Sequence, residues 1–171
     1  MKILFLDMDG VLNSYQHFLM TENDESMFDD DLEFFCQALC AHNIWNLNFI
    51  LEKVPELKIV ISSAWANYLK LQSFKDLLKE FNINPDRIID ITPRKLSSSR
   101  GNEIQWWLDN HQSHESAEVS YAILDDNDDA ISAFHAKQFI HTDCHVGLTI
   151  VDAFKVIKLL EPTYQLPIVM M

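Results

Sequence analysis

Short apolar runs alternate along this chain with longer segments whose apolar residues recur every three or four positions. The first run, Ile-Leu-Phe-Leu at 3–6, predicts a buried β-strand. Similar runs predict strands at 57–61, 87–91, 121–124 and 137–141. Strands that alternate with helices form parallel sheets with right-handed crossovers. We therefore predict an α/β fold, a three-layer Rossmann-like parallel sheet of about five strands with helices on both faces.

Apolar spacing and end signals identify the helical segments. Helices are predicted over 32–53, 66–81, 103–110 and 150–160, the last of them capped by Thr149. The first is expected to break near His42 and Asn43. In 103–110, the residues Ile104, Trp107 and Leu108 form an apolar stripe, which we interpret as a packing face.

The remaining segments predict one domain with a minimal cap or none. Residues 14–31 are polar and acidic, so we expect a loop or small lid over the site. Residues 162–171 are expected to form a C-terminal tail, whose apolar end leaves room for a partner. At 171 residues the chain fits a single domain, 1–171, that buries about two-thirds of the surface its unfolded chain exposes.

Charge and hydropathy narrow the function classes. The net charge of −13 opposes general binding to nucleic acid or anionic membranes, because the field of the protein repels polyanions. No apolar segment reaches the ~20 residues of a membrane span, and the first run is interrupted at Asp7. We therefore expect a soluble, cytoplasmic protein without a membrane partner.

The cysteines do not indicate a disulfide framework. Cys36, Cys40 and Cys144 are an odd number without paired spacing, and the first two would share one face of a helix. His141, Cys144 and His145 form a denser cluster near a predicted strand end. A zinc site there is less favoured than a cluster without a metal, since no second ligand set has a typical spacing.

The end of the first strand carries the most informative residues of the chain. Asp7 and Asp9 are two positions apart, so their side chains can serve one site, and Gly10 allows a sharp turn after them. Two such carboxylates repel unless a cation lies between them, and Mg²⁺ prefers carboxylate and phosphate oxygens. The alternatives are a solvated acidic turn and a calcium loop, which fails because its fifth and twelfth positions are Val11 and Phe18.

Two other predicted strands also end in polar residues. Ser62 and Ser63 follow the second strand, and Asp125 and Asp126 follow the fourth. The carboxyl ends of parallel strands lie at one rim, where open α/β sheets bind their ligands. Each pair has a simpler interpretation, a strand-end cap for the serines and an acidic helix start for the aspartates. Their joint occurrence at strand ends indicates one site.

With these residues, the sequence resembles the haloacid dehalogenase-like (HAD) superfamily of phosphatases with an aspartate nucleophile. Asp7-Met-Asp-Gly-Val resembles the first motif, Ile61-Ser-Ser-Ala-Trp the second and Leu124-Asp-Asp the fourth. The third motif usually supplies a lysine, whereas Arg100 is the best-placed basic residue here and Lys95 is its rival. Over residues 1–160 the chain also resembles, more narrowly, the compact HAD domains found beside RNA-repair enzymes, in segments 62–65, 100–104, 124–126 and 142–149.

The resemblance implies a two-step phosphoryl transfer. Asp7 would attack phosphorus to form an aspartyl phosphate, and Asp9 would protonate the leaving oxygen and later deprotonate the attacking water. Mg²⁺ would be held by Asp7, Asp125 and the carbonyl of Asp9, while Asp126 would orient a metal-bound water.

The same resemblance implies the phosphate contacts. Ser62 and Arg100 would bind the non-bridging oxygens, where the transition state spreads negative charge. Ser63 is the alternative hydroxyl, and Lys95 the alternative cation.

These inferences favour a Mg²⁺-dependent phosphatase that acts on a phosphomonoester, with a nucleotide or a nucleic-acid end as the candidate substrate. One alternative is a phosphorylatable receiver-like domain, which would carry its reactive aspartate at the end of the third strand, near Asp90. Another is a catalytically silent HAD-like interaction domain, against which the presence of both Asp7 and Asp9 argues.

Overall fold

The structure of the chain is a computed structural model, which describes residues 1–21, 31–94, 99–111, 119–128 and 135–165. Within these residues, one sheet contains the strands β1 (Lys2–Leu6), β2 (Leu57–Ile61), β3 (Ile88–Ile91), β4 (Ser120–Asp125) and β5 (Phe139–His141). The strands are parallel and pair in the order β3-β2-β1-β4-β5. The predicted α/β fold with a Rossmann-like parallel sheet is therefore confirmed.

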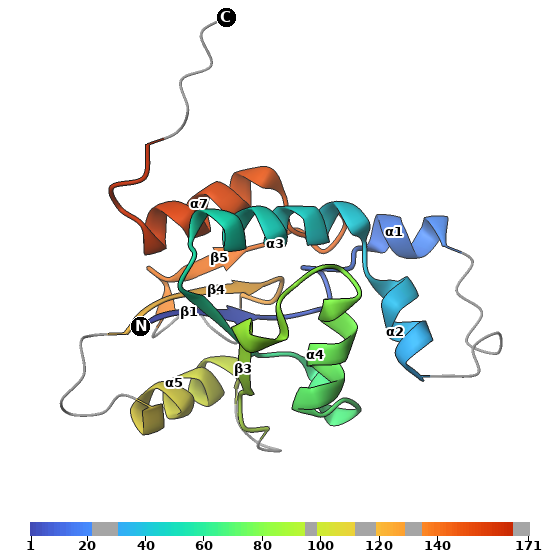
Figure 1. The fold of residues 1–171 in the computed structure, drawn as a ribbon, viewed down its shortest axis with the longest axis horizontal. Coiled ribbons are helices and arrows are strands. Elements are labelled where there is room, and N and C mark those ends of the chain that lie inside the picture. Colours follow the sequence, from blue (N-terminus) through green and yellow to red (C-terminus); the bar gives the residue numbers. More distant parts are fainter. Residues whose placement is uncertain (22–30, 95–98, 112–118, 129–134, 166–171) are drawn as a thin grey trace, which may run out of the picture.

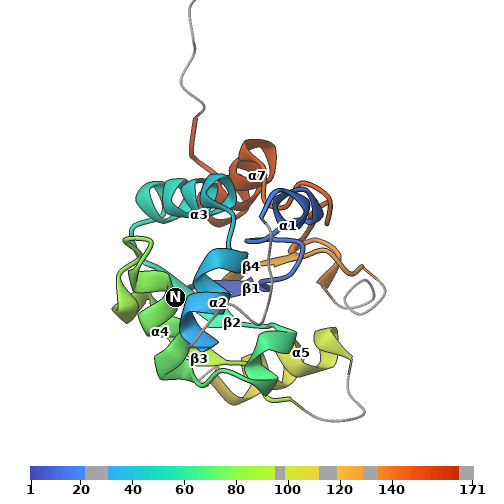
Figure 2. The ribbon, with the colours of Figure 1, turned by 90° about the vertical axis from the view of Figure 1, so that its right-hand side faces the viewer.

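Helices cover both faces of the sheet (Figure 1). α3 (Ala41–Lys53), α4 (Leu71–Lys79) and α7 (Ile150–Leu160) pack on one face, and α5 (Arg100–His111) packs on the other. Two short helices, α1 (Tyr15–Met20) and α2 (Asp31–Ala38), lie beyond the carboxyl ends of the strands (Figures 1 and 2). Two 3-10 turns, η2 (Ala64–Asn67) and η3 (Pro85–Arg87), complete the described elements. None of the described helices is long and apolar enough to cross a membrane.

The pleat of the strands divides the core into two clusters. Leu4 and Leu6 of β1 pack with α3, α4 and α7, whereas Phe5 points to the other face and packs against Trp107 of α5. The two rings meet edge to face with centroids 5.4 Å apart. Because side chains alternate along a strand, Asp7 is directed to the same face as Phe5, toward α5.

The helical segment predicted over 32–53 is two helices, and the break predicted near His42 and Asn43 lies slightly earlier in the chain. The chain breaks at Cys40, between α2 and α3. Cys40 has an extended backbone, and its N–H donates to the carbonyl of Leu12 at 2.9 Å. The loop after β1 therefore fixes where α3 begins.

Two other predicted boundaries need correction. The segment 14–31 is not all loop, because α1 occupies its first part; Ser14 caps this helix by accepting the N–H of His17 at 3.2 Å. Residues 22–30 of that segment, and 166–171 of the predicted tail, lie outside the described residues. The helix predicted over 66–81 begins only at Leu71, because η2 and an irregular stretch precede it.

Candidate active site at the carboxyl ends of the strands

Polar residues from neighbouring strands meet where the order of the sheet reverses. The chain runs from β1 outward to β3 and then returns to β4 on the other side of β1. Open α/β sheets bind their ligands at such a switch point. The backbone hydrogen bonds between the strands continue into the site. The N–H of Asp7 donates to the carbonyl of Leu124 at 3.0 Å, and the N–H of Ser62 donates to the carbonyl of Leu6 at 2.8 Å.

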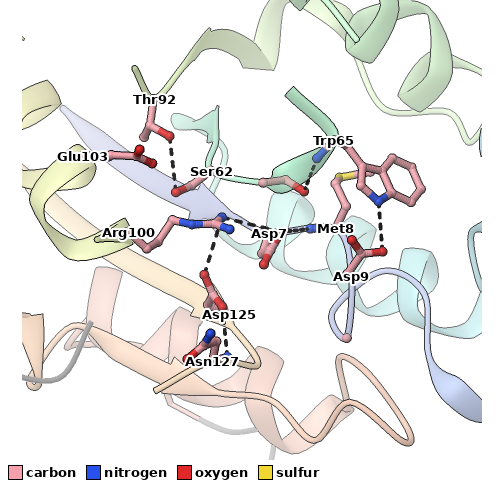
Figure 3. A network of polar contacts seen from close by, with 12 residues as sticks. Asp7, Met8, Asp9, Ser62, Trp65, Thr92, Arg100, Glu103, Asp125 and Asn127 are labelled. Atoms are coloured by element: carbon pink, nitrogen blue, oxygen red, sulfur yellow. Dashed lines mark hydrogen bonds and ion pairs between the residues drawn. The ribbon is translucent and has the colours of Figure 1, made fainter. Parts of the chain in front are cut away.

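Three carboxylates and one guanidinium lie together at this rim. Asp7, Asp125 and Asp126 each offer an oxygen within 4.8 Å of the others, and the first two side chains are buried. The Nη1 atom of Arg100 lies 3.6 Å from an oxygen of Asp7 and 3.6 Å from an oxygen of Asp125 (Figure 3). Because Arg100 is the first residue of α5, the helix start places this cation directly against the ends of β1 and β4.

Burial dominates the electrostatics of the cluster. It raises the pKa of Asp7, while the positive charge of Arg100 and a hydrogen bond from Ser63 act in the opposite direction. Burial, followed by the negative charge of Asp7, raises the pKa of Asp125 to about 7. Burial also raises the pKa of Asp126. One guanidinium therefore does not fully offset the charge that three ionised carboxylates bring to this rim.

The donor set of this cluster fits Mg²⁺. Carboxylate oxygens are the hard ligands that Mg²⁺ binds, commonly one or two of them together with a substrate phosphate. An excess of negative charge on buried groups favours a bound cation. Asp7, Asp125 and Asp126 are the residues that would hold it.

Gly10 shapes the loop that follows β1. The carbonyl of Met8 accepts the N–H groups of Val11, Leu12 and Asn13 at 3.3, 2.9 and 3.2 Å, which makes the turn tight. Gly10 has a φ of +64°, and a Cβ built there would lie 2.3 Å from Oδ2 of Asp126. A glycine is needed both for the backbone conformation and for the close approach of the Asp126 side chain, which directly follows β4.

Asp9 stands apart from the three clustered carboxylates. Its side chain is exposed, and its Oδ1 accepts hydrogen bonds from Nδ2 of Asn13 at 2.8 Å and Nε1 of Trp65 at 2.9 Å. Two groups of three side chains among the described residues could hold a metal ion, Asp7, Asp125 and Asp126 at this rim and the exposed Asp143, Cys144 and His145, and Asp9 belongs to neither. The Asp9 carbonyl as a metal ligand stays a prediction.

The serines after β2 have different contacts. The hydroxyl of Ser62 is buried and accepts a hydrogen bond from Thr92 at 3.5 Å, whereas the hydroxyl of Ser63 accepts the N–H of Trp65 at 3.3 Å. Ser63 also donates to Asp7, as noted above. Both serines thus lie at the site, while the rival cation Lys95 lies outside the described residues.

Sequence reasoning assigned no role to three residues that the structure brings to this rim. Trp65 reaches Asp9 and Thr92 reaches Ser62 (Figure 3), and the buried carboxylate of Glu103 lies 3.8 Å from Arg94. Thr92 directly follows β3, so the strand-end argument used for the other strands would have found it. The contact of Trp65 had no sequence signal, since it joins residues far apart in the chain.

A pocket of about 400 Å³ borders the loop that carries Asp9. Its lining includes Gly10, Asn13, Tyr15, Phe18, Cys144 and His145. The rings of Tyr15 and His145 lie edge to face, with centroids 5.8 Å apart. The ring of His141 takes no part in the pocket lining; its Nε2 lies 2.8 Å from the carbonyl oxygen of Asp126. The pocket therefore offers aromatic and apolar contacts beside the loop that carries Asp9.

Comparison with known proteins shows which family the chain belongs to. The solved structures include a similar one, the HAD domain of effector protein Lem4 from Legionella pneumophila, with a TM-score of 0.54 and 17% sequence identity over 96% of this chain and 97% of that chain. At this identity the likeness shows the fold. No curated protein matches the chain. A family described as the HAD domain in Swiss Army Knife RNA repair proteins matches residues 3–153, and the chain belongs to this family.

Proposed function

We propose that this protein is a Mg²⁺-dependent phosphatase that hydrolyses a phosphomonoester through an aspartyl phosphate on Asp7. The observation that carries the proposal is the position of Asp7, buried at the switch point next to Arg100 and to the carboxylates of Asp125 and Asp126. A nucleophilic carboxylate beside a cation and a hard-oxygen cluster is the arrangement that phosphoryl transfer requires.

The two steps use Asp7 and Asp9 in turn. First, an oxygen of Asp7 bonds to phosphorus as the bond to the leaving oxygen breaks, and Asp9 gives its proton to that oxygen. Then Asp9 takes a proton from water, whose oxygen bonds to phosphorus as the bond to Asp7 breaks. Inorganic phosphate leaves, and Asp9 is again protonated.

The remaining charge on the phosphoryl group is met by this chain's own groups and by the cation. Arg100 donates to non-bridging oxygens, and the start of α5 adds the positive end of a helix dipole. Ser62, with Ser63 as the alternative, supplies a hydroxyl donor. Bound Mg²⁺ supplies charge neutralisation at the phosphoryl oxygens.

A nucleotide or a nucleic-acid end is the substrate class that we favour. The family description refers to RNA repair proteins. The pocket beside the Asp9 loop adds Tyr15, Phe18 and His145, rings on which a nucleobase can stack. The net charge of −13 opposes broad binding to nucleic acid, so local contacts at the site have to select the terminal phosphate.

The receiver-like alternative has no support at the third strand. Asp90, where a receiver would carry its reactive aspartate, accepts the indole N–H of Trp107 at 2.7 Å and lies 3.4 Å from His111. These contacts bind Asp90 to α5. We therefore assign the phosphoryl group to Asp7, which lies beside Arg100 at the switch point of the sheet.

A phosphate-release screen with Mg²⁺ tests the proposal. Nucleoside monophosphates, oligonucleotides with terminal phosphates, sugar phosphates and para-nitrophenyl phosphate are compared for the parental protein and for Asp7→Asn. We expect turnover of at least one phosphomonoester by the parental protein alone. Equal phosphate release by both proteins would contradict the proposal.

A further inference from the structure

We infer that Trp65 and Asn13 are positioning residues that hold Asp9 for proton transfer to the leaving group. This inference rests on the proposed function. It starts from two hydrogen bonds that end on the same atom, Oδ1 of Asp9. Nε1 of Trp65 lies 2.9 Å from it (Figure 3), and Nδ2 of Asn13 lies 2.8 Å from it. We call this arrangement the Asp9 clamp.

The orientation of the Asn13 amide is fixed by its other end. Oδ1 of Asn13 accepts the backbone N–H of Gly10 at 2.9 Å, so the amide nitrogen must face Asp9. The backbone N–H of Asn13 donates to the carbonyl of Met8 at 3.2 Å. One side chain thus joins the turn after β1 to the carboxylate that this turn carries.

The indole of Trp65 is held by packing. Only 7% of the residue is exposed, and its ring lies 4.6 Å from that of Phe35 on α2, centroid to centroid. Its backbone N–H donates to Ser63 at 3.3 Å, at the start of η2. The clamp therefore ties the end of β2 to the loop after β1, and α2 supports it from outside.

The clamp has a chemical consequence because it binds one of the two carboxylate oxygens of Asp9 and leaves the other free of it. In the described residues, both hydrogen bonds of the Asp9 side chain end on Oδ1. An oxygen that accepts two N–H groups has no free direction for a proton of its own, so the acid form carries its proton on Oδ2. The clamp thereby selects the oxygen that meets the leaving group, and it prevents an exposed carboxylate from turning into solvent.

The test varies the leaving group while the phosphoryl group stays the same. Phenyl and para-nitrophenyl phosphate have the same ring, but phenolate is the poorer leaving group and depends more on a proton donor. For Trp65→Phe and for Asn13→Ala, we expect kcat/KM with phenyl phosphate to fall about tenfold, and with para-nitrophenyl phosphate about twofold. Asp9→Asn should show the same selectivity more strongly, about 10²-fold or more with phenyl phosphate.

Trp107→Phe is the matched control. It also removes an indole N–H from an aspartate, the 2.7 Å bond to Asp90, and Trp107 is likewise buried, with 2% exposed. We expect it to change kcat/KM equally for the two substrates. Melting temperatures of all variants show whether each protein is folded under assay conditions.

The outcomes separate this inference from the proposed function. If the parental protein is active, and kcat/KM of the Trp65→Phe and Asn13→Ala variants falls by the same factor for both substrates, the positioning role alone is overturned. A parental protein that releases phosphate from neither substrate, nor from any compound of the wider screen, would overturn the proposed function and the positioning role with it.

Discussion

The Nη1 atom of Arg100 lies 3.6 Å from Oδ1 of Asp7, which joins the first residue of α5 to the residue that follows β1. This contact is a charge interaction without hydrogen-bond geometry, since among the described residues Nη1 has no hydrogen-bond partner. A buried donor without a partner is costly. A phosphoryl oxygen in the site would supply the missing acceptor, which is why the pair is central to the proposed chemistry.

Arg100→Ala should therefore lower kcat/KM far more than it lowers stability. A charge-assisted bond to the transition state is lost, and we expect a decrease of about 10²- to 10³-fold. Arg100→Lys should recover only part of the rate, because a point charge cannot reproduce the two-pronged contact of a guanidinium.

Lys95→Ala is the comparison that decides between the two cations. The measurement is steady-state kinetics with Mg²⁺, together with melting temperature. If Lys95→Ala inactivates the protein while Arg100→Ala stays within a few-fold of parental activity, the assignment of Arg100 is wrong.

Asp7→Asn should abolish turnover while the fold stays intact. The amide keeps the shape of the side chain but cannot act as the nucleophile, so kcat should fall by roughly 10⁴-fold or more. The negative charge of Asp7 is one cause of the raised pKa of Asp125. Its removal should leave the metal-free melting temperature equal or higher, and a large decrease would show that Asp7 is needed for folding instead.

Mg²⁺ should stabilise the protein, because it binds the folded carboxylate cluster and not the unfolded chain. At roughly 100 times its Kd, a ligand contributes about 2.7 kcal/mol, which is roughly 5–10 °C in Tm for a domain of this size. The Mg²⁺-dependent rise in Tm should be larger at pH 8 than at pH 6. The pKa of Asp125 is about 7, so at the lower pH the cation must displace the proton of Asp125.

Asp126→Asn is the control for this cation effect. It removes one of the three clustered carboxylates and should reduce the Mg²⁺-dependent gain in Tm. A parental melting curve that millimolar Mg²⁺ leaves unchanged at low ionic strength would contradict the metal site.

Local patterns in the sequence were enough to predict the sheet and the residues at its rim. A buried strand needs only a short apolar run, and parallel strands bring their ends together whatever the loops do. This is why Asp7, Ser62 and Asp125 could be grouped before the structure was known. Their roles in catalysis stay predictions.

Contacts between distant segments set the features that could not be predicted. The break at Cys40 depends on the carbonyl of Leu12, and the side chain of Trp65 is directed by Asp9 and by Phe35. The start of α5, by contrast, could have been predicted, since the sequence holds a local signal for it. Ser99 accepts the N–H of Asn102 at 3.4 Å, a capping contact that moves the helix start back from 103 to Arg100.

His135 should make the stability of the fold depend on pH. Its ring is fully buried, with Nε2 3.1 Å from the carbonyl of Gly101 and Nδ1 2.9 Å from the hydroxyl of Tyr121. This pairing suits a neutral ring that donates to Gly101 and accepts from Tyr121. Burial lowers the pKa of His135, and a histidine in the unfolded chain titrates near about 6.5.

The sign of the effect follows from these two states. Above about pH 6.5 the ring is neutral in both, and its contacts contribute fully to stability. As the pH falls below that value, the unfolded chain binds the proton first, so this contribution is lost toward the lowered pKa of the folded state. The carboxylates with raised pKa act in the opposite direction, since their protonation favours the folded state as the pH falls.

A difference measurement isolates the histidine from those carboxylates. His135→Gln should lower Tm most at pH 7 to 8, and the gap to the parental protein should narrow as the pH approaches 5. His42→Gln, at an exposed position, changes the histidine count equally and should show no such trend. A gap between the parental protein and His135→Gln that is constant, or that widens toward pH 5, would show that His135 is not held neutral against Gly101 at the start of α5.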